Sequence, residues 1–448
     1  MRTGGRKLKF ILLTLCCLLP AGVYGQSVNG RVDGSVKDAG NAVVTGANVT
    51  ITNKQNGARR TATTDTEGVF TIPEVAPGVY EVKVEAAGFR VTTISQLAVQ
   101  VGTPASIAIS LETGNLSETV TIEAGAAQLT VNTTNAEIGD VVNRRRVLEM
   151  PLDGRNPLDL IALQAGASDT GRVNGIRARG INITVNGINA SDDFNKSEDN
   201  LIDNPTIPVS VESVREFRVT TSQATAEFGR GSAQVNVVTE SGTNDYRGSL
   251  FAFHRNTALN ANSFFNNRQG LPRERLIRNQ FGGRIGGPIR LPKTILGPLG
   301  GYDGKDKTFF FFAYEGTRLA AAQSLNRLVY TAQARAGDFR YLNGLVTTPA
   351  NVAANPGAIR AASNLLTLRP GFNVPDPTTK ALLDRTPPPN NFDLGDGLNT
   401  GGYRFNARRS APRDIYSFRF DHRFSDRYSL ELNYSYALRA GMVALDRA

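Results

Sequence analysis

The sequence predicts a mainly β protein with three parts: a small β-sandwich, a mixed α/β domain, and long antiparallel strands with the proportions of a transmembrane β-barrel. Three observations lead to this prediction. Short alternating segments rich in Val, Thr and Ile, separated by turn residues, fill residues 34–111. Residues 135–242 mix helical and strand periodicity. From Tyr246 onward, strand-length alternating segments are separated by long polar or Pro/Gly-rich stretches.

The N-terminus has the pattern of a secretory signal peptide. Four cations precede an apolar run at residues 10–19, and small residues follow up to Gly25. The run is shorter than the roughly 20 apolar residues that a membrane-spanning helix needs, and no later segment comes close to that length. We therefore expect residues 1–25 to be cleaved on export and the mature chain to contain no transmembrane helix.

The composition argues against catalysis. Both cysteines, Cys16 and Cys17, lie within the signal peptide, so no disulfide or thiol nucleophile is expected in the mature chain. The only two histidines, His254 and His422, stand in no metal-binding or catalytic motif, and surface or strand positions account for both. We predict that the protein is not an enzyme and has no cofactor and no metal site.

The charge pattern gives little support for nucleic-acid binding. The net charge of +10 falls to +6 when the four signal-peptide cations are removed, and the remaining Arg and Lys are scattered among acids. The densest basic run is NRRR at residues 143–146. The end of a solvated helix explains this run as well as a ligand would.

Residues 26–112 are predicted to form the β-sandwich. In GVYEVKVEA, apolar residues alternate with charged ones, which indicates one buried face and one wet face. Asp65 and Gly68 stand where a tight turn needs them. The phrase T…D..G.F.I…PG.Y.V.V.A.GF, from Thr64 to Phe89, resembles the carboxypeptidase-regulatory-like domain, which has a transthyretin-like or carbohydrate-binding-like fold. Because this segment has no histidine, the resemblance implies a structural or docking module and not a zinc peptidase.

A polar connector, TGNLSET, leads from the sandwich into ETVTIEAGA. This second segment is consistent with an edge strand. It also resembles the TonB box, which implies that its main chain pairs with a strand of a TonB-type periplasmic energy-coupling protein. Glu123 departs from the resemblance, because the family usually has threonine there. The candidate partner-binding residues are Glu118, Thr119, Val120, Thr121, Ile122, Glu123 and Ala124.

Residues 113–242 are predicted to contain this segment and a plug domain. Leucines at mostly helical spacing, interrupted at Pro151 and Pro157, predict two short helices. NITVNGINASDD predicts a strand, an Asn-Gly turn and a strand. The VNG turn, VREFRV and AEFGRGSAQVNVVTESGTN resemble the plug of TonB-dependent receptors, closest to the Oar-like group.

Residues 243–448 are predicted to form the N-terminal part of an outer-membrane β-barrel. Tyr416, Phe418 and Phe420 alternate with polar residues before a turn near Ser425 and Asp426. Strands of about ten residues with one apolar and one charged face are typical of transmembrane barrels. After the turn the apolar positions are Tyr428, Leu430, Leu432, Tyr434 and Tyr436.

The stretch NQFGGRIGGPI at residues 279–289 has four glycines. Interior glycines disfavour a helix, whereas Phe281, Ile285 and Ile289 share one side of a strand. In Oar-like receptors this phrase, followed by KTFFFF.YEGTR, begins the barrel. The resemblance implies that the glycines let the strand curve and lie close to the plug.

The resemblance implies an outer-membrane receptor that takes up an unidentified extracellular ligand, with carbohydrate and peptide both open, energised from the inner membrane. It also implies contact with outer-membrane lipid, and the Pro-rich residues 347–403 are expected to form an irregular ligand-binding loop. The predicted barrel region contains about six strand-like units, whereas transporters with a plugged barrel have roughly 22 strands. We therefore expect a portion of a longer receptor or a truncated product. The alternative function is a non-transporting cell-surface or periplasmic scaffold that binds carbohydrate or protein.

Overall fold

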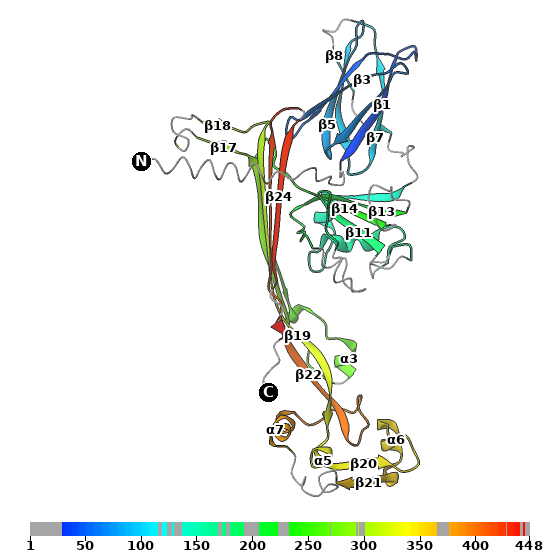
Figure 1. Ribbon diagram of the computed structural model, residues 1–448, viewed down its shortest axis with the longest axis vertical. Helices are drawn as coiled ribbons and strands as arrows, with labels where there is room; N and C mark the ends of the chain where they lie inside the picture. Colours follow the sequence, from blue (N-terminus) through cyan, green and yellow to red (C-terminus); the bar gives the residue numbers. More distant parts are fainter. Residues whose placement is uncertain are drawn as a thin grey trace, which may run out of the picture. The chain divides into compact units, whose positions relative to one another are not determined.

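A computed structural model describes residues 29–114, 119–122, 128–129, 137–168, 173–175, 180–191, 206–222, 233–268, 270–292, 294, 301–364, 376–426, 428–439 and 442–443. The fold is mainly β, as predicted (Figure 1). One compact unit comprises Met1–Leu250, Gly282–Glu315 and Ile415–Ala437; the other comprises Phe251–Phe281, Gly316–Asp414 and Leu438–Ala448. None of the helices in the described ranges has the length and apolar character needed to cross a membrane.

The sandwich consists of two sheets, with strand orders β4-β1-β7-β9 and β3-β2-β5-β6-β8. Buried aliphatic side chains from both sheets, with Phe70 and Tyr80, form one continuous core. The turn predicted at Asp65 is confirmed: its carboxylate accepts hydrogen bonds from Glu67 N and Val69 N, both at 2.9 Å. The strands are β1 (Gly30–Asp38), β2 (Asn48–Asn53), β3 (Arg59–Thr63), β4 (Val69–Val75), β5 (Gly78–Glu85), β6 (Val91–Val99), β7 (Pro104–Leu111), β8 (Thr119–Ile122) and β9 (Gln128–Leu129).

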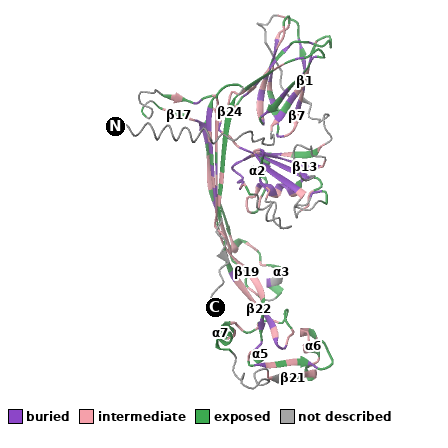
Figure 2. Ribbon diagram, in the orientation of Figure 1, coloured by how far each residue is buried: buried purple, intermediate pink, exposed green. Residues whose placement is uncertain are grey.

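The mixed domain is a sheet of order β10-β13-β14-β11-β12 with two short helices. Both predicted helices are present, as an α-helix, α2, and a 3-10 helix, η2. The Asn-Gly turn is also confirmed, since Asn186 and Gly187 both have positive φ, the geometry of a type I′ hairpin. The three inner strands, β11, β13 and β14, are buried along almost all of their length, whereas β10 and β12 are largely exposed (Figure 2). The elements are β10 (Ile138–Asn143), α2 (Arg144–Glu149), η2 (Pro157–Leu163), β11 (Ile181–Val185), β12 (Ile188–Asn189), β13 (Val214–Ser222) and β14 (Ala233–Thr239).

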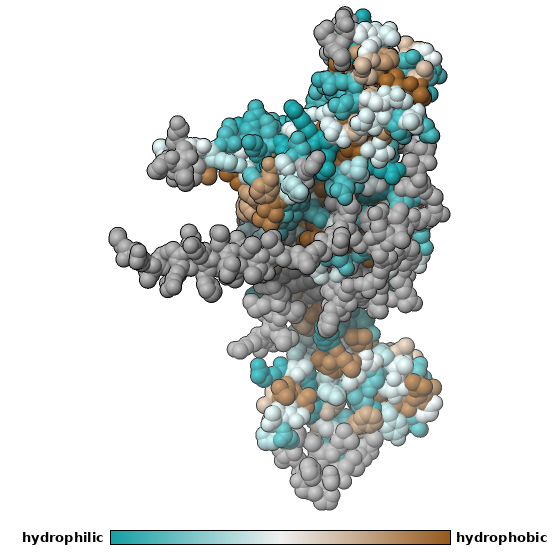
Figure 3. All heavy atoms as spheres, turned by 45° about the horizontal axis from the view of Figure 1, so that its top comes forward, coloured by the Kyte–Doolittle hydropathy of each residue, from teal (hydrophilic) through white to brown (hydrophobic). Residues whose placement is uncertain are grey.

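Seven strands form a third, larger sheet, which does not close into a barrel within the described residues. The predicted alternation is present: Phe418 is 41% exposed, whereas its neighbour Ser417 is 6% exposed. Figure 3 shows apolar side chains reaching the surface in several separate clusters. The strands are β15 (Arg247–Asn256), β16 (Leu276–Pro288), β19 (Thr308–Tyr330), β22 (Thr400–Ser410), β23 (Arg413–Arg423), β24 (Ser429–Arg439) and β25 (Met442–Val443). The exposed apolar residues of β24 are Leu430, Leu432, Tyr434, Tyr436 and Leu438.

The glycine-rich stretch is strand β16, as its alternation predicts. A Cβ atom on Gly287 would come within 2.4 Å of the Tyr246 ring, and one on Gly283 within 2.7 Å of Ser249 O on β15. These glycines are therefore required by the close approach of Tyr246 and the adjacent strand. The expected approach to the plug is not what fills the space at these two positions.

The expectation of an irregular loop over residues 347–403 was wrong. The described part of this stretch contains helices and one strand of a hairpin, and β22 already begins at Thr400. N-capping explains why helices form here: the side chains of Thr348 and Asp376 each accept a hydrogen bond from a backbone N–H of the helix that follows. Arg335 adds hydrogen bonds to the carbonyls of Leu383, Thr386 and Pro387. The elements are α5 (Ala332–Arg335), β20 (Asp338–Leu342), α6 (Pro349–Ala354), η7 (Pro356–Ala358), β21 (Ile359–Asn364) and α7 (Pro377–Arg385).

The remaining short elements lie between the long strands. They are η5 (Thr257–Leu259), α3 (Phe264–Arg268), β17 (Arg290–Leu291) and β18 (Tyr302–Asp303).

Candidate functional site

The predicted partner-binding segment lies at the edge of the sandwich. Thr119–Ile122 form β8, which pairs in parallel with β6, with Thr119 opposite Val91 and Ile122 opposite Ile94. β8 is the last strand of its sheet, so its other edge has no partner strand among the described residues. Glu118, Glu123 and Ala124 lie outside the described residues.

A second candidate site is a set of buried ion pairs between the mixed domain and the long strands, here called the Glu212 cluster. The Glu212 side chain is 6% exposed and accepts a hydrogen bond from Arg155 Nη2 at 3.1 Å. Arg284 Nε of β16 lies 3.4 Å from its second oxygen. Ser249 of β15 donates a hydrogen bond to the same oxygen at 3.1 Å. One carboxylate of the mixed domain is thus held by side chains of two long strands.

Two more carboxylates complete the Glu212 cluster. Glu240, directly after β14, lies 3.0 Å from Arg144 Nη1 and 3.7 Å from Arg284 Nη1. Glu315 of β19 lies 3.6 Å from Arg155 Nε. Three arginines therefore face three glutamates, which makes the cluster formally neutral. Burial lowers the pKa of Arg144, and the nearby carboxylate of Glu240 opposes that shift.

The interpretation of NRRR as a solvated helix end was wrong for its first arginine. Arg144 is 19% exposed and paired with Glu212 and Glu240, whereas Arg145 is 82% exposed. The position of Arg144 three residues before the buried Val147 places both on one face of α2. This helical phase was the available signal, but the charge count alone did not reveal it.

A further polar contact joins β14 to β23 and β24. Arg419 Nη2 lies 2.8 Å from Glu431 and 2.9 Å from Asp421. Arg419 also donates a long hydrogen bond to the carbonyl of Thr239 at 3.4 Å. A polar side chain of the hairpin thus contacts the mixed domain.

The sandwich and the mixed domain meet where the β6–β7 turn contacts β13. The residues of this contact, here called the clamp, are Val101, Gly102 and Thr103 of the turn and Glu216 and Arg218 of β13. Val101 N donates to Glu216 Oε1 at 2.7 Å, and Arg218 Nη1 donates to Thr103 Oγ1 at 2.8 Å. Arg218 also donates to the carbonyl of Gly102. Burial raises the pKa of Glu216, and the Val101 N–H partly opposes this shift.

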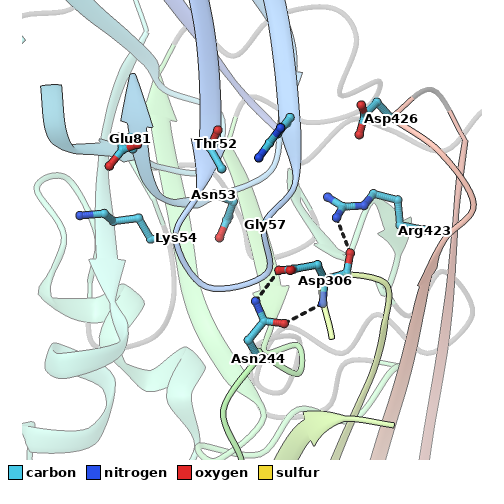
Figure 4. A pocket seen from close by; sticks show the side chains of 10 residues that line it. Thr52, Asn53, Lys54, Gly57, Glu81, Asn244, Asp306, Arg423 and Asp426 are labelled. Atoms are coloured by element: carbon cyan, nitrogen blue, oxygen red, sulfur yellow. Dashed lines mark hydrogen bonds between the residues drawn. The ribbon is translucent and has the colours of Figure 1, made fainter. Parts of the chain in front are cut away.

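A polar pocket of about 500 Å³ lies beside the β2–β3 turn. In Figure 4, Asn244 and Asp306 face each other across two hydrogen bonds, from Asn244 Nδ2 at 2.6 Å and from Asp306 N at 2.8 Å. Arg423 donates to the carbonyl of Asp306. His422 lies close by along the chain but is hydrogen-bonded to Thr308. Across the described residues there is no group of three His, Cys, Asp or Glu side chains placed to hold a metal ion.

Two known families match parts of the chain. Residues 31–112 match the carboxypeptidase regulatory-like domain, and residues 238–440 match an outer membrane beta barrel domain. The chain is 26% identical over 299 residues to the TonB-dependent transporter Oar of Myxococcus xanthus. In sequence, the chain is thus similar to Oar-like TonB-dependent receptors. The match covers 62% of this chain but only 26% of Oar. These similarities place the Oar-like chain in the outer membrane.

Similarity to solved structures is weak. A cohesin–X-dockerin complex from Acetivibrio cellulolyticus is 23% identical, covering 19% of this chain and 58% of that chain, with a TM-score of 0.16. The 3-chlorocatechol 1,2-dioxygenase of Rhodococcus opacus is 14% identical, covering 21% and 64%, with a TM-score of 0.17. Scores this low carry no argument about function.

Proposed function

We propose that this Oar-like chain is part of an energy-dependent outer-membrane transporter. Residues 26–112 form its accessory sandwich, residues 113–242 its partner-binding segment and plug, and residues 243–448 the first part of its barrel. A TonB-type protein pulls on the segment at β8, the plug moves, and an extracellular ligand passes into the periplasm. No covalent chemistry is needed.

The Glu212 cluster is the observation that supports this function best. A plug that moves must separate from the strands around it without a large loss of free energy. Separating apolar surfaces costs about 25 cal/mol for each Å² exposed to water. Buried charges behave differently, because they regain hydration when they separate, and this offsets much of the lost attraction. Ion pairs that cross from the plug to the long strands include Arg155–Glu315, Arg284–Glu212 and Arg284–Glu240. A contact of this kind suits a plug that leaves and returns.

Plug movement is testable without knowing the ligand. The sequence after Gln26 contains no cysteine, so single cysteines can be placed cleanly. Ser417 is 6% exposed and lines a pocket together with Val185, Asn186 and Thr239 of the plug. The test is maleimide labelling of the Ser417→Cys variant of the full-length receptor, in cells from complete growth medium, with and without a protonophore.

If the plug moves, Cys at position 417 reacts several-fold faster in energised cells than in cells treated with the protonophore. The matched control is Ser429→Cys on β24, where the native serine is exposed, so labelling should be equal in both conditions. Equally slow labelling at position 417 in both conditions would favour the alternative function, a scaffold that binds carbohydrate or protein without transport.

A further inference from the structure

The segment that follows the sandwich extends both of its sheets. β8 pairs with the edge of β6, and β9 pairs antiparallel with β7, with Leu129 opposite Ser106. Each is the last strand of its sheet. Without β8, residues 91–94 of β6 would present an unpaired main-chain edge, which proteins usually cover. The candidate partner-binding strand is therefore a structural part of the sandwich.

The clamp connects the sandwich to the plug. Val101–Glu216 and Thr103–Arg218 join positions more than 100 residues apart in the sequence, with separations of 115 residues each. Both plug residues belong to β13, which is an interior strand between β10 and β14. The Glu216 side chain is buried, so water does not compete freely for its hydrogen bond. A load applied to the sandwich is thus delivered to the middle of the plug sheet.

From these two observations we propose that the sandwich is the docking platform for the energy-coupling protein. An extended strand of that protein adds to the open edge of β8 while β8 remains on β6, and the pull reaches the plug through the sandwich and the clamp. This inference rests on the proposed function. It assigns a role to the accessory domain, namely presenting the strand and transmitting the load.

Pre-organisation is the physical reason for this arrangement. A disordered four-residue segment must lose backbone entropy when it forms a strand with its partner. β8 already has extended backbone dihedrals fixed by its pairing with β6, so the partner meets a prepared edge. Recognition through main-chain groups also tolerates Glu123, the departure from the family's sequence pattern.

A reversible covalent link between β6 and β8 tests the platform. Thr93 and Thr121 are opposite each other in register, so the Thr93→Cys/Thr121→Cys variant should form a disulfide that holds β8 in place. The control is Thr50→Cys/Lys83→Cys, which links the antiparallel pair β2 and β5 at opposite positions away from β8. The probe is the purified periplasmic domain of the organism's TonB protein, titrated against the full-length receptor in detergent, oxidised and then reduced.

If β8 is presented on the sandwich, the oxidised variant binds the TonB domain as tightly as the reduced variant does, or up to about tenfold more tightly. Tighter binding would arise because the linked β8 loses less conformational entropy when the partner binds. The docking platform would be overturned if oxidation weakened binding tenfold or more, if reductant restored the binding, and if the control variant showed no such change. In that case β8 would have to leave β6 before the TonB domain could bind. If neither the wild type nor any variant binds, the assignment of β8 as a TonB-binding strand fails, and the partner in the proposed function fails with it.

Load transmission is tested at the clamp. Arg218→Gln removes most of the hydrogen bonding to Gly102 and Thr103 without touching β8. If the sandwich transmits the load, the affinity of this variant for the TonB domain is unchanged, while the labelling rate of Cys at position 417 in energised cells falls several-fold. The control is Lys37→Gln on the exposed surface of β1, which should alter neither readout. Undiminished labelling in Arg218→Gln would show that the load bypasses the sandwich.

Discussion

At the scale of single residues, this protein buries charged side chains at positions where the local sequence predicts an exposed polar surface. Glu212 lies in the VES phrase before β13. Its partners come from α2, from the turn at Arg155 and from β16. Removing one member of such a buried group leaves the others desolvated and unpaired, which costs far more than losing a surface pair.

Glu212→Ala should therefore destabilise the plug by about 3–5 kcal/mol. The loss is measurable as a lower midpoint in urea unfolding of the purified receptor in detergent. The matched control is Glu149→Ala, whose partner Arg145 is 82% exposed, and that change should cost less than about 1 kcal/mol. Similar losses in the two variants would mean that the Glu212 cluster is hydrated.

The buried carboxylate of Glu216 makes the clamp sensitive to pH. Its pKa is raised in the folded protein, mainly by burial, so the folded state binds this proton more tightly than the unfolded state does. Its contribution to stability is then fully present below the unfolded pKa and is lost as the pH rises through the folded pKa. Glu216→Gln keeps an acceptor for Val101 N–H but does not titrate.

We expect the difference in unfolding free energy between wild type and Glu216→Gln to change between pH 4 and pH 8, with the wild type relatively more stable at the acidic end. Urea unfolding across that range measures this difference. Parallel pH profiles for the two proteins would contradict the assignment of the raised pKa to this position.

At the scale of elements, close strand packing explains the glycines better than curvature alone does. Gly242, which joins the plug to β15, is surrounded like those of β16. A Cβ on it would come within 2.4 Å of Phe310 O and 2.8 Å of Gly287 O. Both contacts are to backbone, which cannot rotate away as a flexible side chain can.

Gly242→Ala should consequently cost about 1–3 kcal/mol through overpacking. The unfolding midpoint in urea provides the measurement. Gly357→Ala is the control, because a Cβ at that position meets no atom within 4 Å and its φ is not in the left-handed region. Equal midpoints for the two variants would show that β19 can shift to admit a methyl group.

At the scale of the whole molecule, the two buried cores within the described residues are separate. The sandwich core contains only residues between Val32 and Leu111, and the core of the mixed domain only residues between Val142 and Val237. The contacts between these two parts described above are hydrogen bonds. Each core is thus complete without the other. We therefore expect each of the two parts to be stable by itself.

Residues 29–114 should therefore fold when expressed alone, with a single cooperative urea transition and a slope typical of a domain of this size. Far-UV circular dichroism would follow the transition. A chain that stays unfolded would mean that β8, β9 or the clamp is needed for the sandwich to form. Adding residues 115–129 to the expressed segment would separate the strands from the clamp.

Much of the fold was predictable from the sequence because it depends on local chemistry. Alternation in GVYEVKVEA and in the hairpin around Ser425 predicts strands and their buried faces, and Asp65 and the Asn186–Gly187 pair predict their turns. The ordered helices within residues 347–403 were missed, although Thr348 and Asp376 were recognisable as N-caps.

The sequence by itself determined the domain order, the strand periodicity and the Oar-like resemblance, because neighbouring residues carry these signals. Only the tertiary structure decided that Arg144 is buried, that Gly287 has Tyr246 against it, and that β8 completes a sheet with β6. Each of these depends on groups far apart in the chain. Burial, desolvation and edge pairing arise only when folding brings such groups together, so no local pattern encodes them.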